Sequence, residues 1–181
     1  MRVFVAVEIS NAEILKKIQT FQEELLIKAK PTRIDQIHFT LQFLGEIDEL
    51  KYAEVRDVLK TIVFSQFDLS LKGVGAFPSL KNPRVIWVGC DEKGAEKLSE
   101  IAKEIAVKLS SLGFEKDKKF KPHLTILRVK HKIGDVTVQV SKHAQIDFGS
   151  QIISKIKLKR SVLSPKGPEY SDLLEVNGNE N

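Results

Sequence analysis

Apolar residues recur along this chain in two rhythms, one typical of buried strands and one typical of amphipathic helices. Residues 2–7 and 84–89 each consist of an arginine followed by an apolar run rich in valine and isoleucine. Such runs predict buried strands. After each run, apolar residues recur every three or four positions, over residues 14–25 and 98–112. That spacing places them on one face of a helix.

The ends of these two helices are indicated by residues that favour helix termini. Ser10 and Glu13 have the spacing of a capping box, and Asp91 is suited to cap the second helix. Pro31 is expected to stop the first helix and Gly113 the second.

A second strand follows each helix, and both of these strands carry the motif His-x-Thr. The first reads IHFTLQFL over residues 37–44, and the second reads PHLTILRV over residues 122–129. The two histidines, His38 and His123, are 85 residues apart, close to the offset of 82 between the two opening runs. Two copies of one strand–helix–strand unit explain both offsets.

Plainer elements complete the pattern. A helix is expected near residues 49–63 and a strand within Phe67–Phe77, with late strands over 150–163 and 171–176. Residues 136–140 alternate like a strand, but their neighbours would also permit a helix.

The length of the chain, 181 residues, suits one domain with a sizeable core. No linker or low-complexity segment divides the sequence. We therefore expect a single α+β domain over residues 1–181, made of two pseudo-symmetric lobes. The pseudo-repeats cover roughly residues 1–80 and 81–165, with late strands interleaved between them.

Composition excludes several classes of function. The formal net charge of +5 favours anionic partners, among which nucleic acid is the commonest. Cys90 is the single cysteine, so an internal disulfide and a thiolate metal cluster are excluded. No apolar stretch approaches the ~20 residues that span a membrane. The first residues read as a strand rather than a signal peptide, so we expect a cytoplasmic protein with no membrane partner.

The two histidine strands present polar faces. Because alternate side chains of a strand share a face, His38, Thr40 and Gln42 point one way in the first strand, and His123 and Thr125 do so in the second. The residues between them are apolar and suit the core. If two similar lobes meet, the polar faces can line one cleft.

This arrangement suits phosphoryl chemistry. A neutral imidazole can take a proton from an attacking water while a protonated imidazole gives one to a departing ribose oxygen. The threonine hydroxyls can hold phosphate oxygens. A lone His-x-Thr strand would carry little weight, because a lone histidine is usually structural, but two equivalent copies favour catalysis. We expect no metal, because no short His or Cys spacing supplies a third ligand, and no cofactor.

Three further features leave alternatives open. Arg128 could grip phosphate, but strict alternation turns it away from His123, and only a bulge would bring it back. Phe43 holds the equivalent place in the first strand. It could stack a base if the same irregularity recurs, although packing in the core is favoured. The lysines of residues 115–121 could attract RNA, although a solvated loop is the default.

The chain resembles the two-histidine phosphoesterase superfamily, and within it the RNA 2′,3′-cyclic phosphodiesterases, also called 2′-5′ RNA ligases. The resemblance covers nearly the whole chain and is carried by Arg2–Val7, His38–Gly45, Gly73–Pro78, Phe120–Arg128, Ser161–Ser164 and Gly167–Tyr170. The paired histidine motifs are its most specific part.

The resemblance implies a bilobal fold with two antiparallel sheets, helices outside and a cleft between the lobes. It implies that His38 and His123 are catalytic, that Thr40 and Thr125 hold phosphate, and that Arg128 lines the site. Relatives open the cyclic phosphate to a 2′-phosphate, which makes His38 the proton donor and His123 the proton acceptor.

The expected function is therefore hydrolysis of RNA 2′,3′-cyclic phosphate ends, with 2′-5′ joining of RNA ends as a second activity. The expected partners are RNA ends of this kind, with tRNA fragments among the candidates, and the expected state is a monomer. A non-catalytic RNA-binding module is the competing interpretation, because the positive charge and an aromatic stacking residue would suit it as well.

Overall fold

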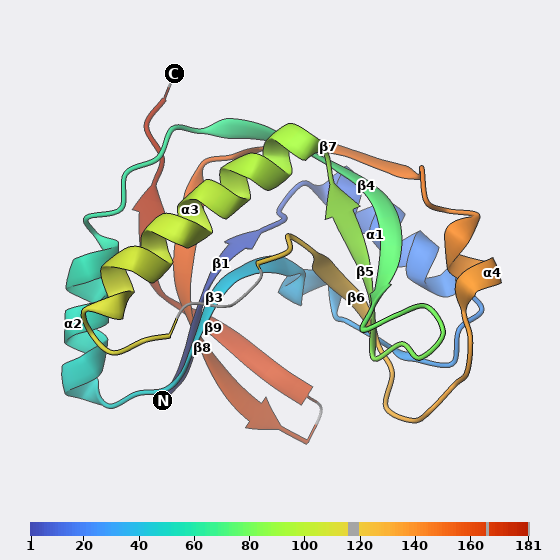
Figure 1. Cartoon of the computed structure of the whole chain (residues 1–181), viewed down its shortest axis with the longest axis horizontal. Helices are drawn as coiled ribbons and strands as arrows, with labels where there is room; N and C mark the ends of the chain where they lie inside the picture. Colours follow the sequence, from blue (N-terminus) through green and yellow to red (C-terminus); the bar gives the residue numbers. More distant parts are fainter. Residues whose placement is uncertain (116–119, 166, 181) are drawn as a thin grey trace.

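The described part of the protein, in a computed structural model, is a curved antiparallel sheet flanked by helices (Figure 1). The structure describes residues 1–115, 120–165 and 167–180. The elements follow the chain as β1 (Arg2–Glu8), α1 (Ala12–Glu24), β2 (Lys30–Pro31), a 3-10 turn (Ile34–Gln36), β3 (His38–Glu46), α2 (Glu49–Leu59), β4 (Phe67–Phe77), β5 (Val85–Cys90), α3 (Glu92–Ser110), β6 (Leu124–Arg128), α4 (Thr137–Ser141), β7 (Asp147–Ile153), β8 (Lys155–Ser164) and β9 (Gly167–Asn177).

The sheet consists of two halves that meet in its middle. Its strand order is β7-β4-β5-β6-β3-β1-β8-β9, and the short β2 pairs with β6. The central strands β3 and β6 are joined by one pairing, Phe39 opposite Leu124. The two expected antiparallel sheets are thus halves of one sheet, and the late strands are shared between them, β7 on one side and β8 and β9 on the other.

The helices cross between the halves. Helix α1 follows β1, yet it packs against β6 and β7 of the other half. Helix α3 follows β5, yet it packs against β3 as well as β4. Figure 1 shows α2 and α3 beside the half that holds β1 and β3, and α1 and α4 beside the half that holds β4 to β7. Each long helix therefore ties the two halves together.

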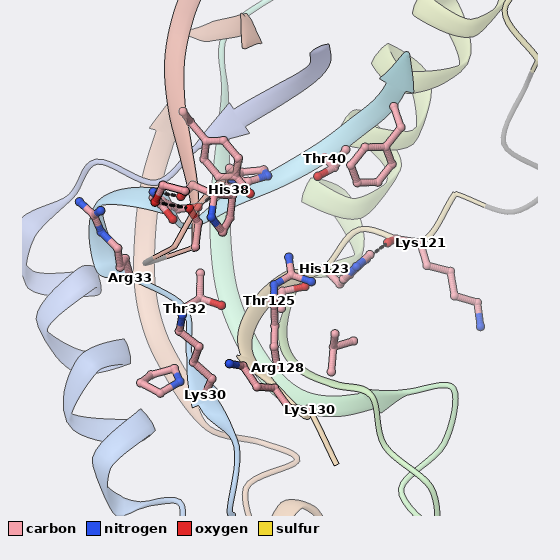
Figure 2. A pocket seen from close by; sticks show the side chains of 18 of the residues that line it. Lys30, Thr32, Arg33, His38, Thr40, Lys121, His123, Thr125, Arg128 and Lys130 are labelled. Atoms are coloured by element: carbon pink, nitrogen blue, oxygen red, sulfur yellow. Dashed lines mark hydrogen bonds between the residues drawn. The ribbon is translucent and has the colours of Figure 1, made fainter. Parts of the chain in front are cut away.

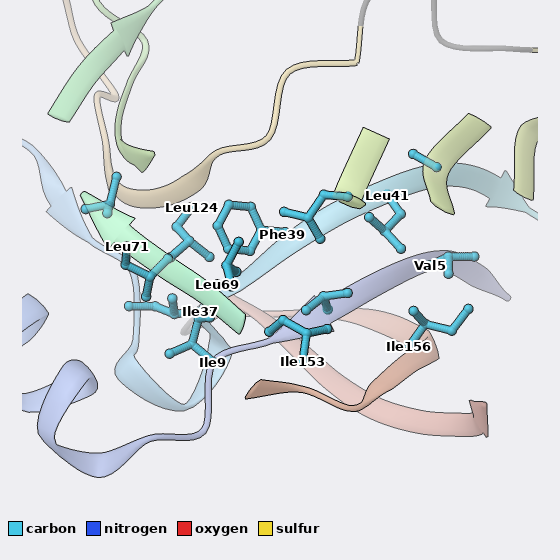
Figure 3. Packing of buried hydrophobic residues seen from close by; sticks show 14 of the residues in the cluster. Val5, Ile9, Ile37, Phe39, Leu41, Leu69, Leu71, Leu124, Ile153 and Ile156 are labelled. Atoms are coloured by element: carbon cyan, nitrogen blue, oxygen red, sulfur yellow. The ribbon is translucent and has the colours of Figure 1, made fainter. Parts of the chain in front are cut away.

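The core runs beneath the junction of the halves. Phe39 and Leu124, the residues that pair across it, are both fully buried. Figure 3 shows them packed with apolar side chains from β1, β4 and β7, among them Val5, Leu69 and Ile153. Burial of this apolar surface is the main force that holds the halves edge to edge.

Two expectations about the first helix are wrong. Its cap is Asn11, whose side chain accepts hydrogen bonds from two backbone N–H groups of the first turn at 3.0 and 3.2 Å. Ser10 instead donates its backbone N–H to the side chain of Gln151, at 3.0 Å. The helix ends at Glu24, because the chain turns extended at the next residue, and Pro31 lies in β2.

The other boundaries agree better with the sequence. Asp91 caps α3, and Gly113 takes a positive φ just after that helix. Residues 137–141 form a short helix, which settles the ambiguous segment. The long strand expected over 150–163 is two strands, β7 and β8, separated at Ser154.

Candidate active site

Both histidine strands contain a bulge at the same distance from the histidine. In β3, Thr40 and Gln42 face consecutive residues of β1, so Leu41 is an extra residue. In β6, Thr125 and Leu127 face consecutive residues of β5, so Ile126 is an extra residue. An extra residue reverses the alternation of the side chains that follow it. Each extra residue lies three positions after its histidine.

The bulges bring two further side chains to the histidine face. Arg128 lines the same cavity as His123, which resolves its two alternatives in favour of the cavity. Phe43 lines that cavity too, with 69% of its surface exposed. The core position that alternation favoured for Phe43 is therefore wrong, because the bulge at Leu41 turns the ring outward. The polar face expected for Gln42 is wrong for the same reason, because the bulge turns that side chain inward, where it is buried.

A buried glutamine holds the second bulge. The side-chain amide of Gln22, on α1, donates to the carbonyl of Ile126 at 2.7 Å and to that of Thr32 at 2.9 Å. The backbone N–H of Thr32 donates to the same Ile126 carbonyl at 2.8 Å. The carbonyl of the extra residue thus accepts two hydrogen bonds, which fixes the bulge and with it the direction of Arg128.

The pairing of β3 with β6 brings the two motifs together. Phe39 and Leu124 directly follow His38 and His123, and they pair antiparallel. In an antiparallel pair, the residue before Phe39 lies beside the residue after Leu124, and the residue before Leu124 lies beside the residue after Phe39. Each histidine is thereby brought toward the threonine of the opposite strand, on the face away from the core.

These side chains line one cavity of about 570 Å³ between the two halves (Figure 2). The cavity contains all six residues singled out in the sequence: His38, Thr40, Phe43, His123, Thr125 and Arg128. It also contains residues that the motifs did not indicate, namely Lys30, Thr32, Arg33, Gln36, Val85, Phe120, Lys121, Lys130, Ser164 and Tyr170.

The two imidazoles are oriented by the same kind of local hydrogen bond. The Nδ1 of His38 lies 2.7 Å from the carbonyl oxygen of Gln36. The Nδ1 of His123 lies 2.6 Å from the carbonyl oxygen of Lys121. In each case a carbonyl two residues earlier accepts the Nδ1 proton, which fixes the tautomer and leaves Nε2 for a ligand.

The ring of His38 is packed between aromatic side chains. Its centroid lies 4.9 Å from that of Phe4 and 5.4 Å from that of Tyr170. Burial lowers the pKa of His38 from 6.5 to about 4. The charges of Lys159 and Arg128 act in the same direction, against the Gln36 carbonyl and Glu8. The empty site therefore holds His38 as a neutral imidazole at neutral pH.

A partly buried cluster of charges lies on the β1, β8 and β9 strands near His38, with Lys159 as its buried member. The ammonium of Lys159 forms ion pairs with Glu8 and Asp172. Lys157 contacts the same two carboxylates, both at 2.6 Å. Because Glu8 pairs with His38 across β1 and β3, this cluster adjoins the buried imidazole.

The cavity is basic. Five of the described residues that line it are Lys or Arg, and none is Asp or Glu. Arg33 is largely neutralised by Asp35, whose carboxylate accepts from its Nε at 3.0 Å. Cations that share a concave surface attract anions into it. Residues 116–119, from the lysine run for which RNA attraction is the alternative to a solvated loop, lie outside the described residues.

Acidic and metal-binding side chains contribute little to this region. Within residues 1–115, 120–165 and 167–180, no group of three or more His, Cys, Asp or Glu side chains is placed to hold a metal ion.

The same residues contain no helix long and apolar enough to cross a membrane.

Several residues that line the cavity were not identified from the sequence, because they come from strands outside the two histidine motifs. Tyr170 comes from β9, a distant strand, and Lys30 from the two-residue strand β2. Tyr170 lies in a segment that resembles the family, which was the one signal available for it. Lys30 and Lys130 reach the cavity because β2 pairs with β6, and no local pattern indicates that pairing.

Comparisons with known proteins agree over nearly the whole chain. The family described as the AKAP7 2'5' RNA ligase-like domain matches residues 2–173. The RNA 2′,3′-cyclic phosphodiesterase of Archaeoglobus fulgidus is 41% identical over 175 residues, which cover 96% of this chain and 98% of the relative. That of Methanocaldococcus jannaschii is 39% identical over 181 residues, covering 97% of this chain and 99% of the relative.

A solved structure agrees as well. The crystal structure of TT0787 of Thermus thermophilus superposes with a TM-score of 0.79 at 29% identity. The match covers 98% of this chain and 97% of that chain.

Proposed function

Since the chain belongs to the AKAP7 2'5' RNA ligase-like domain family, we propose that it hydrolyses RNA ends that carry a 2′,3′-cyclic phosphate. The observation that carries the proposal is the convergence of two His-x-Thr motifs in one basic cavity, each imidazole fixed through Nδ1. The names of the two archaeal relatives support the substrate.

The two imidazoles divide the proton transfers. His123, neutral, takes a proton from water through Nε2 as the water oxygen forms a bond to phosphorus. The bond from phosphorus to O3′ breaks, and His38, protonated, gives its proton to O3′. The product carries a 2′-phosphate and a free 3′-hydroxyl. Exchange with solvent then returns each histidine to its starting state.

The neighbouring side chains hold the substrate. The hydroxyls of Thr40 and Thr125 donate to non-bridging phosphate oxygens and place phosphorus between the imidazoles. Arg128 offsets the charge that builds on phosphorus. The exposed ring of Phe43 stacks on the terminal base.

The substrate itself prepares His38 for its role. With its pKa lowered to about 4, this imidazole is unprotonated in the empty site at neutral pH. An adjacent phosphate anion favours the imidazolium and raises the pKa. His38 therefore acts as an acid once the cyclic phosphate is bound.

A second activity uses the same site. If a 5′-hydroxyl of another RNA replaces water, its oxygen bonds to phosphorus, O3′ departs as before, and the product is a 2′-5′ linkage. The description of the family as 2'5' RNA ligase-like supports this candidate. The proposal extends to tRNA fragments as substrates and to a cytoplasmic monomer as the acting form.

The test is product analysis with a short RNA that ends in a 2′,3′-cyclic phosphate, in EDTA, with and without a 5′-hydroxyl RNA. Turnover to a 2′-phosphate is expected, with joined product in the second reaction. A 3′-phosphate product would reverse the assignment of acid and base. Tight binding without turnover would favour the non-catalytic module, and turnover that needs added metal would overturn the mechanism.

A further inference from the structure

One end of the cavity carries two lysines that the chemistry at the cyclic phosphate does not use, and they lie beside Arg128, which it does use. Lys30 lies directly opposite Arg128 in the β2–β6 pairing, and Lys130 follows Arg128 by two positions. All three side chains line the cavity. Figure 2 shows them together below the histidines, with Thr40 at the opposite end.

The backbone that carries these cations is fixed. Arg128 pairs with Val85 of β5 on one side and with Lys30 of β2 on the other. The next residue, Val129, donates its N–H to the carbonyl of Arg84 at 2.9 Å. The cations therefore stand on a paired strand and its immediate continuation, so an arriving anion meets groups whose backbone is already in place.

Neither Arg128 nor Lys130 has an ion-pair partner among the residues that the structure describes. Arg33, on the same side of the cavity, already has Asp35. Like charges that share a concave surface repel one another, and a bound anion relieves that repulsion.

The spacing suits a second phosphate rather than the first. Arg128 reaches the cyclic phosphate between the histidines, and Lys130 stands two residues beyond it, roughly 7 Å along an extended chain. At the opposite end, beyond Thr40 along β3, the ring of Phe43 offers the base its stacking surface. The end with the cations is left for the backbone of the RNA.

We propose that Lys30 and Lys130 form a subsite for the phosphodiester that joins the terminal nucleoside to the rest of the RNA. The substrate is then an RNA chain rather than a cyclic mononucleotide. This inference rests on the proposed function and adds to it the residues that hold the RNA beyond its terminal nucleoside.

The test removes the negative charge from the RNA and the positive charge from the protein separately. Two dinucleotides with a terminal 2′,3′-cyclic phosphate are compared, one with a phosphodiester between its nucleosides and one with an uncharged methylphosphonate. The wild type is compared with Lys130→Met and with Lys132→Met, an exposed lysine two residues further that does not line the cavity. The dissociation constants of the same pair ending in a 2′-phosphate are measured in parallel.

For the wild type and Lys132→Met, the methylphosphonate should lower kcat/KM and affinity about tenfold, the size of one charge-assisted contact. For Lys130→Met, the two linkages should differ less than about threefold, since the partner charge is gone. Lys30→Met should behave in the same way.

Equal losses in Lys130→Met and the wild type would overturn the subsite, as would a wild type indifferent to the linkage. If Lys121→Met, and not Lys130→Met, removed the difference, the RNA would leave by the opposite end and the proposal would fail. If neither dinucleotide turned over, the proposed function would fail, and the binding constants would still decide the subsite.

Discussion

Each catalytic candidate is shaped by its nearest neighbours. In both histidines, Nδ1 is fixed by the carbonyl of the residue two positions earlier. In each motif, a stretch of three residues is therefore enough to orient the imidazole. Their surroundings differ, because His38 is enclosed by Phe4 and Tyr170. Among the residues that the structure describes, the ring of His123 has one aromatic neighbour, Phe77, with the ring centroids 4.9 Å apart.

The protonation of His38 gives a first prediction. Its ring signals in an NMR titration of the free protein should report a pKa of about 4, lowered from 6.5 by burial. Adding a nucleoside 2′-phosphate should raise that pKa, because the bound anion stabilises the imidazolium. A pKa near 6.5 in the free protein, or no change on binding the nucleotide, would contradict the account of the acid.

The residues of the motifs could be predicted from sequence because strand alternation alone decides their face. Thr40 and Thr125 share the face of their histidines since neither bulge lies between them. Arg128 and Phe43 could not be placed in this way. Their direction depends on an extra residue that strict alternation does not contain.

At the scale of elements, the bulge in β6 depends on a helix residue far away in the chain. Gln22 lies 104 residues before Ile126, whose carbonyl it binds. Its place on α1 looks ordinary in the sequence, since the apolar stripe of that helix does not include it. The signal that determines the direction of Arg128 is therefore a tertiary hydrogen bond.

We predict that Gln22→Met lowers the free energy of unfolding by about 1–3 kcal/mol, because the carbonyl of Ile126 loses one of its two donors and the carbonyl of Thr32 loses the Gln22 amide. It should also lower kcat/KM, because the bulge that directs Arg128 is loosened. Chemical denaturation and turnover of a cyclic-phosphate dinucleotide measure the two effects.

Gln19→Met is the matched control, since Gln19 is exposed on the same helix. It should change the free energy of unfolding by less than about 0.5 kcal/mol. A Gln22→Met protein as stable and as active as the wild type would show that the hydrogen bonds of Gln22 do not stabilise the bulge.

At the scale of the molecule, the two halves are tied by more than their one strand pairing. The long helices α1 and α3 each pack on strands of the opposite half. The sequence predicted these helices and their buried faces, but an apolar stripe does not say which strand will cover it. The α+β class could therefore be predicted from the sequence, and the crossing of the helices could not.

We propose that the chain is one domain, and we predict that it unfolds in one step. Trp87, the single tryptophan, reports on the half that holds β5. The ring signals of His38 report on the other half. Because α3 packs on strands of both halves, and α1 follows a strand of one half and packs on the other, fluorescence and NMR should give the same denaturant midpoint. A His38 signal lost at clearly lower denaturant than the Trp87 change would indicate two separate units.

The central claim is that two histidines act as an acid–base pair on a cyclic phosphate. The most direct test is turnover of a dinucleotide ending in a 2′,3′-cyclic phosphate, in EDTA, by the wild type, His38→Ala and His123→Ala. His143→Ala is the control, because that ring packs on Phe21, outside the cavity.

We predict that the wild type and His143→Ala turn over equally, and that each of the other two variants, folded by circular dichroism, loses activity about 100- to 10,000-fold. Full activity in folded His38→Ala or His123→Ala, or an inert wild type, would contradict the account.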